Sequence, residues 1–372
     1  MAAFFLKKDP FEKTLAIDIG TASLVGALSR RRRVSAEAPE VLKVFRYPLD
    51  VLGRDSTRFY TAKLTKLFEE AHGAEHSIDR IRLVFSSPLF LEKVVQKRFV
   101  RPRPHAAITG DELKESVLAA EDLAAGAGEN MVVASRAVRS INVNGYPVAH
   151  AEGYKGKFLD IEMECLFINS FFGKFIAEIR DTFFPKSELS YHADSAVTIG
   201  GIEHMFAEPR PLVVVDVGGE VTAACVSKDH GREHGEPVPF GVRTLERRIA
   251  GFLQLERSDA EAVLRKFSAG TLDPAMQRRV ERVIASAMED WWAVTKKSLE
   301  PMKITTPRLV AITGGGADIT LFPRVLASGW RQLYGYEITP EVLKAEALRE
   351  YFISMGSLGG GGDFMLASLL LA

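Results

Sequence analysis

One carboxylate near the start of the chain stands where an apolar strand meets a turn of small residues. Asp18 closes the apolar run 15–19, and the turn after it offers Gly20, Thr21 and Ser23. A carboxylate at the end of a buried strand is costly unless it has a partner, and free N–H groups in such a turn can surround an anion. We interpret 15–25 as a phosphate-binding hairpin, with Asp18 positioned to hold a metal ion or its water. An ordinary turn with a capping Asp is the alternative.

A second stretch of the chain repeats this plan. Asp216 ends the apolar run 213–217, and the turn that follows supplies Gly218, Gly219 and Thr222 before a second apolar run. Two matching hairpins, each followed by a long stretch of chain, predict an internal duplication and two similar domains that face one cleft. This repeat favours phosphate binding over the ordinary-turn alternative.

A third turn adds to the two hairpins. The stretch 308–318 is an apolar strand that leads into Gly314, Gly315 and Gly316 and then into a predicted helix. Consecutive glycines at such a position let a flat or anionic ligand approach the backbone, and the end of a strand before a helix is a functional position in α/β folds. A flexible loop without a ligand is the alternative.

The elements that position these turns divide the chain into several predicted units. Residues 11–85 form the first part of one domain, and 86–169 form an inserted small α/β subdomain. Residues 170–208 return to the first domain, 209–345 form the second domain, and 346–372 return to the first again. The helix expected after residue 193 begins at Asp194, which caps it or, alternatively, faces the cleft.

Composition excludes several classes of protein. The chain has 372 residues and 47% hydrophobic content, which is enough for at least two domains, and 48 basic residues balance 48 acidic ones, so nucleic acid is not an expected partner. Cys165 and Cys225 have no metal-ligand spacing, which favours a reduced, cytoplasmic setting. No apolar run reaches the roughly 18–20 residues of a membrane span, so no transmembrane segment is predicted.

The two hairpins and the triple-glycine turn, in this order, resemble the nucleotide-binding signature of the superfamily of actin, sugar kinases and heat-shock chaperones. The insertion 86–169 is similar to that of the bacterial division protein FtsA and its relative PilM of type IV pilus systems. The segments 109–113 and 144–147 resemble FtsA more closely. The resemblance implies an α/β, actin-like (duplicated ribonuclease-H-like) two-domain fold with an inserted small α/β subdomain.

The resemblance also implies that the protein binds ATP and Mg²⁺. The two hairpin turns would hold the β- and γ-phosphates, Asp18 and Asp216 would act on Mg²⁺ through water, and the glycines 314–316 would support the adenosine. The chain departs from the family at Glu220, an acidic residue in the second loop, and at Ala223, which replaces a carboxylate. These departures predict a weak ATPase at most, and they identify no catalytic residue.

Further departures concern the first loop and the nucleoside. Ala22 and Ser23 stand in the region where FtsA has a basic residue, and Leu264 stands where FtsA often has a lysine, with Arg265 adjacent. The apolar run 364–372 matches the last core helix of the actin fold and is too short to span a bilayer.

The resemblance favours an ATP-binding cytoskeletal adaptor of the FtsA type, which assembles with itself and binds a tubulin-like division protein in a nucleotide-dependent way. The alternative is a PilM-like component of a pilus assembly platform that binds a short peptide of a membrane protein. In both cases the protein is expected in the cytoplasm, at the inner face of the membrane through a partner. A small-molecule kinase is a third hypothesis, which the inserted subdomain disfavours.

Overall fold

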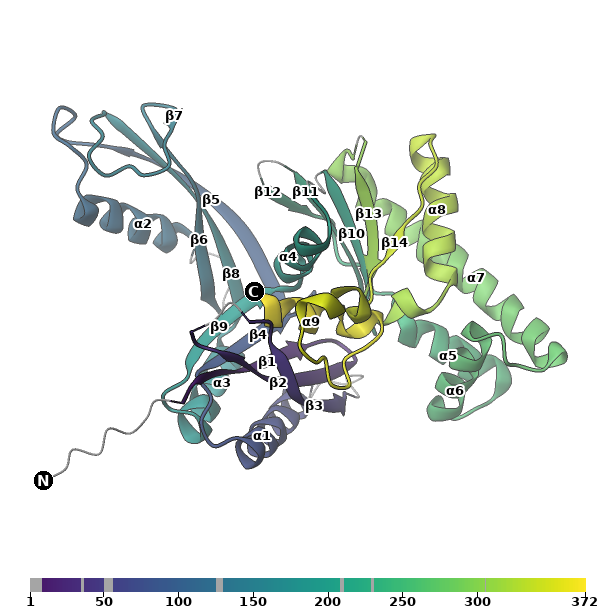
Figure 1. The fold of residues 1–372 in the computed structure, drawn as a ribbon. Helices are drawn as coiled ribbons and strands as arrows, with labels where there is room; N and C mark the ends of the chain where they lie inside the picture. Colours follow the sequence, from purple (N-terminus) through teal and green to yellow (C-terminus); the bar gives the residue numbers. More distant parts are fainter. Residues whose placement is uncertain are drawn as a thin grey trace, which may run out of the picture.

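The computed structural model describes residues 9–34, 37–49, 56–124, 130–207, 211–228, 231–304 and 306–372. Pro209, at the predicted boundary of the second domain, lies outside these residues. Figure 1 shows two sheets flanked by helices on either side of a central region, and a third sheet that projects away from them.

The first sheet is built around the hairpin that carries Asp18. Its strand order is β3-β2-β1-β4-β9, in which β1 pairs antiparallel with β2 and parallel with β4. The strands are β1 (Phe11–Ile19), β2 (Ser23–Arg32), β3 (Glu40–Pro48), β4 (Arg80–Phe85) and β9 (Glu188–Ala193). Helices α1 (Ser56–Ala74) and α3 (Ser170–Phe183) contact each other, and their apolar faces share a core with this sheet.

The second sheet repeats the first. Its order is β12-β11-β10-β13-β14, and the pairing from β12 to β14 is again antiparallel, antiparallel, parallel and parallel. The strands are β10 (Leu212–Val217), β11 (Thr222–Lys228), β12 (Gly231–His234), β13 (Leu309–Thr313) and β14 (Glu341–Val342). The helices are α5 (Val242–Leu253), α6 (Arg257–Ser268), α7 (Pro274–Leu299) and α8 (Leu321–Tyr334). The predicted duplication is therefore present in the sheet topology.

The inserted residues form an antiparallel sheet of their own, in the order β5-β8-β6-β7. Its strands are β5 (Phe90–Val100), β6 (Met131–Val143), β7 (Tyr146–Pro147) and β8 (Phe158–Asn169). Helix α2 (Gly110–Ala124) packs on β5 and β8, and the Thr109 hydroxyl accepts a hydrogen bond from the N–H of Glu112 at its start. Figure 1 shows this unit extending beyond the two larger sheets.

Two helices close the core between the larger sheets. Helix α4 (Asp194–Met205) and helix α9 (Phe364–Leu371) pack against each other, and both contribute to a core that includes Ala16 and Val214. Seven of the eight residues of α9 are buried, so the expected role of 364–372 as a core helix is confirmed. Short 3₁₀ turns complete the fold: Glu300–Met302, Gly315–Asp318, Ala345–Tyr351 and Gly361–Asp363.

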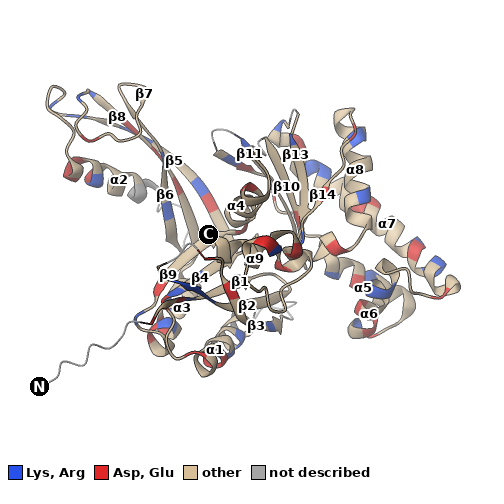
Figure 2. Cartoon of the chain, in the orientation of Figure 1, with Lys and Arg blue, Asp and Glu red and all other residues tan. Residues whose placement is uncertain are grey.

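Charged side chains tie the inserted sheet to the second one. Arg232 of β12 forms ion pairs of 2.7 Å with Glu92 of β5 and with Glu164 of β8, and His234 Nε2 lies 2.6 Å from Glu92 Oε2. Glu92 is only 7% exposed, and the neighbouring Arg232 and His234 hold its pKa well below the usual range. Figure 2 shows that charges of both signs are otherwise spread over all parts of the described chain.

Candidate functional site

The two hairpin turns have the same geometry. In the first, Asp18 is paired with Val25 and the N–H of Gly20 donates to the carbonyl of Ser23 (3.1 Å). In the second, Asp216 is paired with Ala223, and the N–H of Gly218 donates to the carbonyl of Val221 (2.9 Å). Both turns line one cavity of about 330 Å³, because the two sheets place the equivalent hairpins face to face.

The two turns touch each other at the cavity. The N–H of Glu220 donates to the Thr21 hydroxyl (3.2 Å), and a Cβ at Gly219 would lie 2.0 Å from that of Ala22. Gly219 is therefore the residue that allows the turns to approach so closely.

Arg243, which the sequence analysis did not single out, joins the turns from the start of α5. Its N–H donates to the carbonyl of Gly219 (2.9 Å), and its guanidinium donates to that of Ala22 (2.9 Å). It is 6% exposed and lines the cavity. The first turn has no basic residue of its own, but Arg243 of α5 places a cation beside it. The available sequence signal was an arginine two residues after Gly241, at the second position of the helix.

The side chain of Glu220, the acidic residue by which the second turn departs from the family pattern, points toward α5. The Glu220 carboxylate accepts two hydrogen bonds from the Arg247 guanidinium (2.8 and 3.1 Å) and lies 3.5 Å from Arg243. Its side chain is 18% exposed and does not line the cavity. Arg247 therefore neutralises Glu220 and holds its carboxylate away from the cavity.

Among the described residues, no ion pair compensates the two aspartates at the strand ends. Asp18 is 7% exposed, and burial together with the charges of Asp216, Asp194 and Asp363 raises its pKa well above the usual value. Burial and Asp194 raise the pKa of Asp216 to about 7. Carboxylates that repel one another in a buried site are suited to a divalent cation. These residues therefore fit Mg²⁺ held through water, as the resemblance implies.

The triple-glycine turn packs directly on the second aspartate. Gly314 has φ +81°, and a Cβ there would lie 2.2 Å from Asp216 Oδ1. Gly314 and Gly315 line the cavity, whereas Gly316 is buried against Val217.

A second glycine run, which the sequence analysis did not use, meets this turn. Gly361 and Gly362 line the cavity, and a Cβ at Gly361 would lie 2.5 Å from the carbonyl oxygen of Gly314. The N–H groups of Gly360 and Gly361 donate to Glu346 and Asp318 respectively. Four consecutive glycines, 359–362, were the available signal. Together the two runs expose flat backbone to a ligand.

One end of the cavity is lined by charged residues of the second domain. Glu246 of α5 and Arg257 and Glu261 of α6 line it. Leu264, at the position expected near the nucleoside, is instead buried in the core, and Arg265 forms an exposed ion pair with Glu261. Arg257, about two helical turns earlier on α6, reaches the cavity in addition to Arg243.

Most predicted site residues meet at this cavity. Those that line it are Asp18, Gly20, Thr21, Ser23, Asp216, Gly218, Gly219, Gly314 and Gly315. Thr222 lies outside it, because its hydroxyl donates to the Phe240 carbonyl (2.6 Å) and accepts from Trp291 Nε1 (3.0 Å) in the core. Successive strand residues face opposite sides of a sheet, so Ala223 takes the cavity-facing position.

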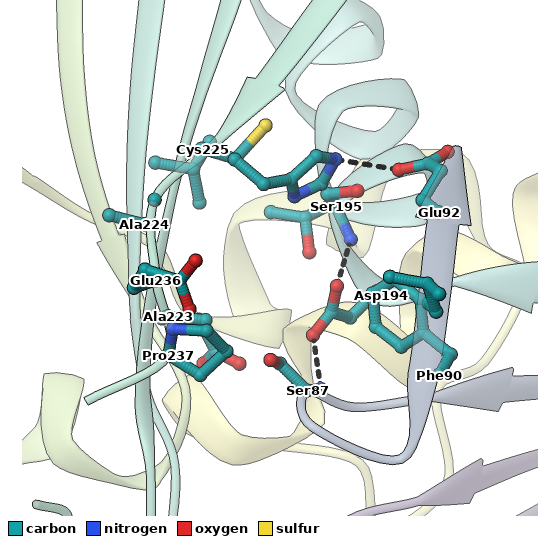
Figure 3. Close-up of a pocket in the computed structure, with 16 residues that line it drawn as sticks. Ser87, Phe90, Glu92, Asp194, Ser195, Ala223, Ala224, Cys225, Glu236 and Pro237 are labelled. Atoms are coloured by element: carbon teal, nitrogen blue, oxygen red, sulfur yellow. Dashed lines mark hydrogen bonds and ion pairs between the residues drawn. The ribbon is translucent and has the colours of Figure 1, made fainter. Parts of the chain in front are cut away.

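Asp194 is the first residue of α4 and not its N-cap, which is Ala193. Helix α4 begins at this residue, and the Asp194 carboxylate accepts from the N–H groups of Ser195 (2.5 Å) and Ser87 (2.9 Å). It also lines a second, smaller chamber beside the first cavity (Figure 3).

The duplicated sheets, the facing hairpins and the inserted sheet define the class of this protein, which has the actin-like ATPase fold. Neither a family model nor a curated protein sequence matches the chain. Among solved structures, the chain is similar to one in the PilM-PilN type IV pilus biogenesis complex. The identity is 17% and the TM-score 0.66, over 96% of this chain and 97% of the other.

Two further structures are more distant. The ethanolamine utilization protein EutJ from Carboxydothermus hydrogenoformans has 14% identity and a TM-score of 0.48, over 98% of this chain and 90% of the other. Diol dehydratase-reactivating factor in nucleotide-free form has 12% identity and a TM-score of 0.49, over 97% and 99%. At these identities the likeness concerns the fold.

No described helix is both long and apolar enough to cross a membrane.

Proposed function

We propose that this chain is a PilM-like, ATP-binding component of a pilus assembly platform, which binds a short peptide of a membrane protein from the cytoplasmic side. The nucleotide part of the proposal is supported by the facing turns, the buried aspartates and the two glycine runs at one cavity. ATP would bind there with Mg²⁺, and closure of the two domains around it would control partner binding.

One observation supports the proposed kind of partner, a peptide of a pilus membrane protein. It is the similarity to a structure of the PilM-PilN complex over nearly the full length of both chains. Coverage of 96% of this chain leaves too few residues out to omit the inserted sheet, so the similarity extends to it. A division adaptor of the FtsA type, with a tubulin-like protein as partner and self-association, is the second candidate. It is favoured by the segments 109–113 and 144–147.

Calorimetry with Mg²⁺-ATP tests the nucleotide part of the proposal. Asp18→Ala removes the first carboxylate, and Gly219→Asp places a side chain against Ala22; both should abolish measurable binding. Gly251→Ala is the control, since a Cβ at Gly251 on α5 meets nothing within 4 Å. Wild-type affinity in the first two variants would refute the site assignment.

Fluorescence anisotropy with labelled peptides tests the partner class. One peptide is the N-terminal cytoplasmic segment of the pilus membrane protein, and the other is the tail of the tubulin-like division protein. Each is titrated with the full chain, with and without Mg²⁺-ATP. We expect binding of the pilus peptide and a change in its affinity with nucleotide. Binding of the division tail alone would replace this proposal with the second candidate.

A further inference from the structure

A second chamber of about 210 Å³ adjoins the nucleotide cavity. It lies between β5, the start of α4 and β11, and it shares Ser87, Thr198, Asp216 and Ala223 with the larger cavity. Figure 3 shows the labelled side chains of α4 facing the space between the strand of Phe90 and Glu92 and the strand of Ala223 and Ala224. The proposed nucleotide contacts leave the α4 side of this chamber unused.

The polar end of the chamber is made by two adjacent residues of α4. Asp194 is 5% exposed and Ser195 is 6% exposed. The Asp194 carboxylate is fixed by two backbone N–H groups, whereas the Ser195 hydroxyl has no hydrogen-bond partner among the described residues. A buried hydroxyl without a partner costs free energy. A ligand that fills the chamber can therefore recover this hydrogen bond.

The charged residues that line the chamber determine whether it favours a cationic or an anionic ligand. Its described lining includes Glu92, Asp194, Asp216 and Glu236 and contains no lysine or arginine. Glu92 is neutralised by Arg232, but burial raises the pKa of Asp194 to about 6. Near neutral pH the inner end therefore holds a carboxylate without an ion-pair partner among the described residues. An anion would be repelled, and a cation would be stabilised.

Much of the remaining lining of the chamber is apolar. Phe90, Leu91, Val214, Cys225 and Pro237 line them. An inorganic cation would leave these surfaces in contact with water, whereas a short alkyl chain would cover them. The chamber therefore suits a molecule with a cationic head and a short hydrocarbon body.

We propose that this chamber binds a small primary amine, with the ammonium group on the Asp194 carboxylate and the Ser195 hydroxyl and the alkyl chain against Phe90 and Leu91. This ligand is separate from the nucleotide. The site is complete in the absence of ATP, so its test does not depend on the proposed function.

Ligand-observed NMR titration of the nucleotide-free chain provides the test, with three probes that share a four-carbon chain. Butylammonium should bind, 1-butanol should bind more weakly by about tenfold, and butyrate should not bind, because a hydrogen bond to a charged group is worth more than a neutral one. Sodium chloride keeps the ionic strength equal throughout, and potassium chloride is added only as a competitor of butylammonium. Nα-acetyl-lysine methylamide, which carries the same ammonium on a polypeptide-like backbone, distinguishes a free amine from a protein lysine as the source.

Two variants locate the binding. Asp194→Asn should weaken butylammonium binding by about tenfold or more, and Ser195→Ala, which keeps the fold and the charge, by a few fold. Glu233→Gln is the matched control, because Glu233 is exposed on β12 and pairs with Lys228 at the surface. Thermal unfolding of each variant checks its fold.

Three results would overturn the proposal. They are equal affinity for butylammonium and butanol, displacement of butylammonium by potassium at matched concentration, and unchanged binding in both Asp194→Asn and Ser195→Ala. Retained butylammonium binding in a chain that fails to bind Mg²⁺-ATP would leave this inference standing and refute the nucleotide site alone.

Discussion

The backbone N–H of Glu220 donates a hydrogen bond to the Thr21 hydroxyl, so the two turns that face the cavity are in direct contact across the domains. The side chain of the same glutamate points to α5, where Arg247 binds it. One residue therefore links the turns through its backbone while its charge is kept from the proposed phosphate site. The effect of nearby substitutions follows from this arrangement.

We expect Gly219→Ala to separate the two turns. The new Cβ would lie 2.0 Å from the Cβ of Ala22, so the turns must move apart, and Mg²⁺-ATP affinity should fall by about tenfold or more, since a single steric clash in a well-packed region costs roughly 1–3 kcal/mol. Calorimetry measures the change. Ala22→Gly in the same chain should restore part of the affinity, and lack of any rescue would contradict the contact.

Arg247→Ala should weaken Mg²⁺-ATP binding by releasing the Glu220 carboxylate toward the phosphates. The loss should be a few fold, because Arg247 is 38% exposed and Arg243 still lies 3.5 Å from Glu220. Adding Glu220→Gln should restore the affinity. Arg248→Ala is the control, since Arg248 pairs with Asp290 at the surface. Equal effects of the two arginine variants would argue against the shielding role.

Asp216→Asn should stabilise the ligand-free protein above neutral pH and abolish its stabilisation by Mg²⁺-ATP. Burial raises the folded-state pKa of Asp216 from 3.8 to about 7. The charged form of Asp216 therefore destabilises the folded protein above about pH 7. This destabilisation disappears as the pH falls through 7 toward 3.8.

Thermal unfolding without Mg²⁺ between pH 8 and pH 5.5 measures this effect. The melting temperature of the Asn variant should exceed that of the wild type most at pH 8, with the gap narrowing as the pH falls. Asp290→Asn, which removes an exposed carboxylate, should show no such trend. A gap that widens on acidification would contradict the assignment.

Gly361→Ala should lower nucleotide affinity more than Gly362→Ala. A Cβ at Gly361 would lie 2.5 Å from the Gly314 carbonyl oxygen, whereas one at Gly362 would lie 3.8 Å from its nearest neighbour, Gly315. Because Gly314 packs on Asp216, displacement of this turn also disturbs the Asp216 end of the cavity. Calorimetry of the two variants with Mg²⁺-ATP compares adjacent positions in one chain, and a larger loss for Gly362→Ala would contradict the packing.

Much of the fold followed from local patterns. The apolar runs ending in Asp18 and Asp216, with glycine two residues later, predicted both hairpins, and the structure has them as β1–β2 and β10–β11. The prediction succeeded because strand alternation and glycine turns depend on neighbours in the sequence. The resemblance added the actin-like fold, which the duplicated sheet order confirms.

The roles of single side chains near the cavity could not be predicted in this way. Thr222 faces the core because strand β11 turns its alternate residues inward, and Arg257 reaches the cavity where the resemblance pointed to the region of Leu264. The position of Arg257 depends on how α6 packs on α5, and the contact of Thr222 with Trp291 depends on how α7 packs on β11; no local pattern specifies either arrangement.

By itself, the sequence determined where the turns are and which of them carry carboxylates, because these properties belong to short segments. Only the tertiary structure decided that Gly361 meets Gly314, that Arg247 neutralises Glu220, and that Asp194 and Ser195 face a chamber of their own. Each of these contacts joins separate elements. Their geometry is set by the packing of whole helices and sheets, in which the free energy is shared among many side chains.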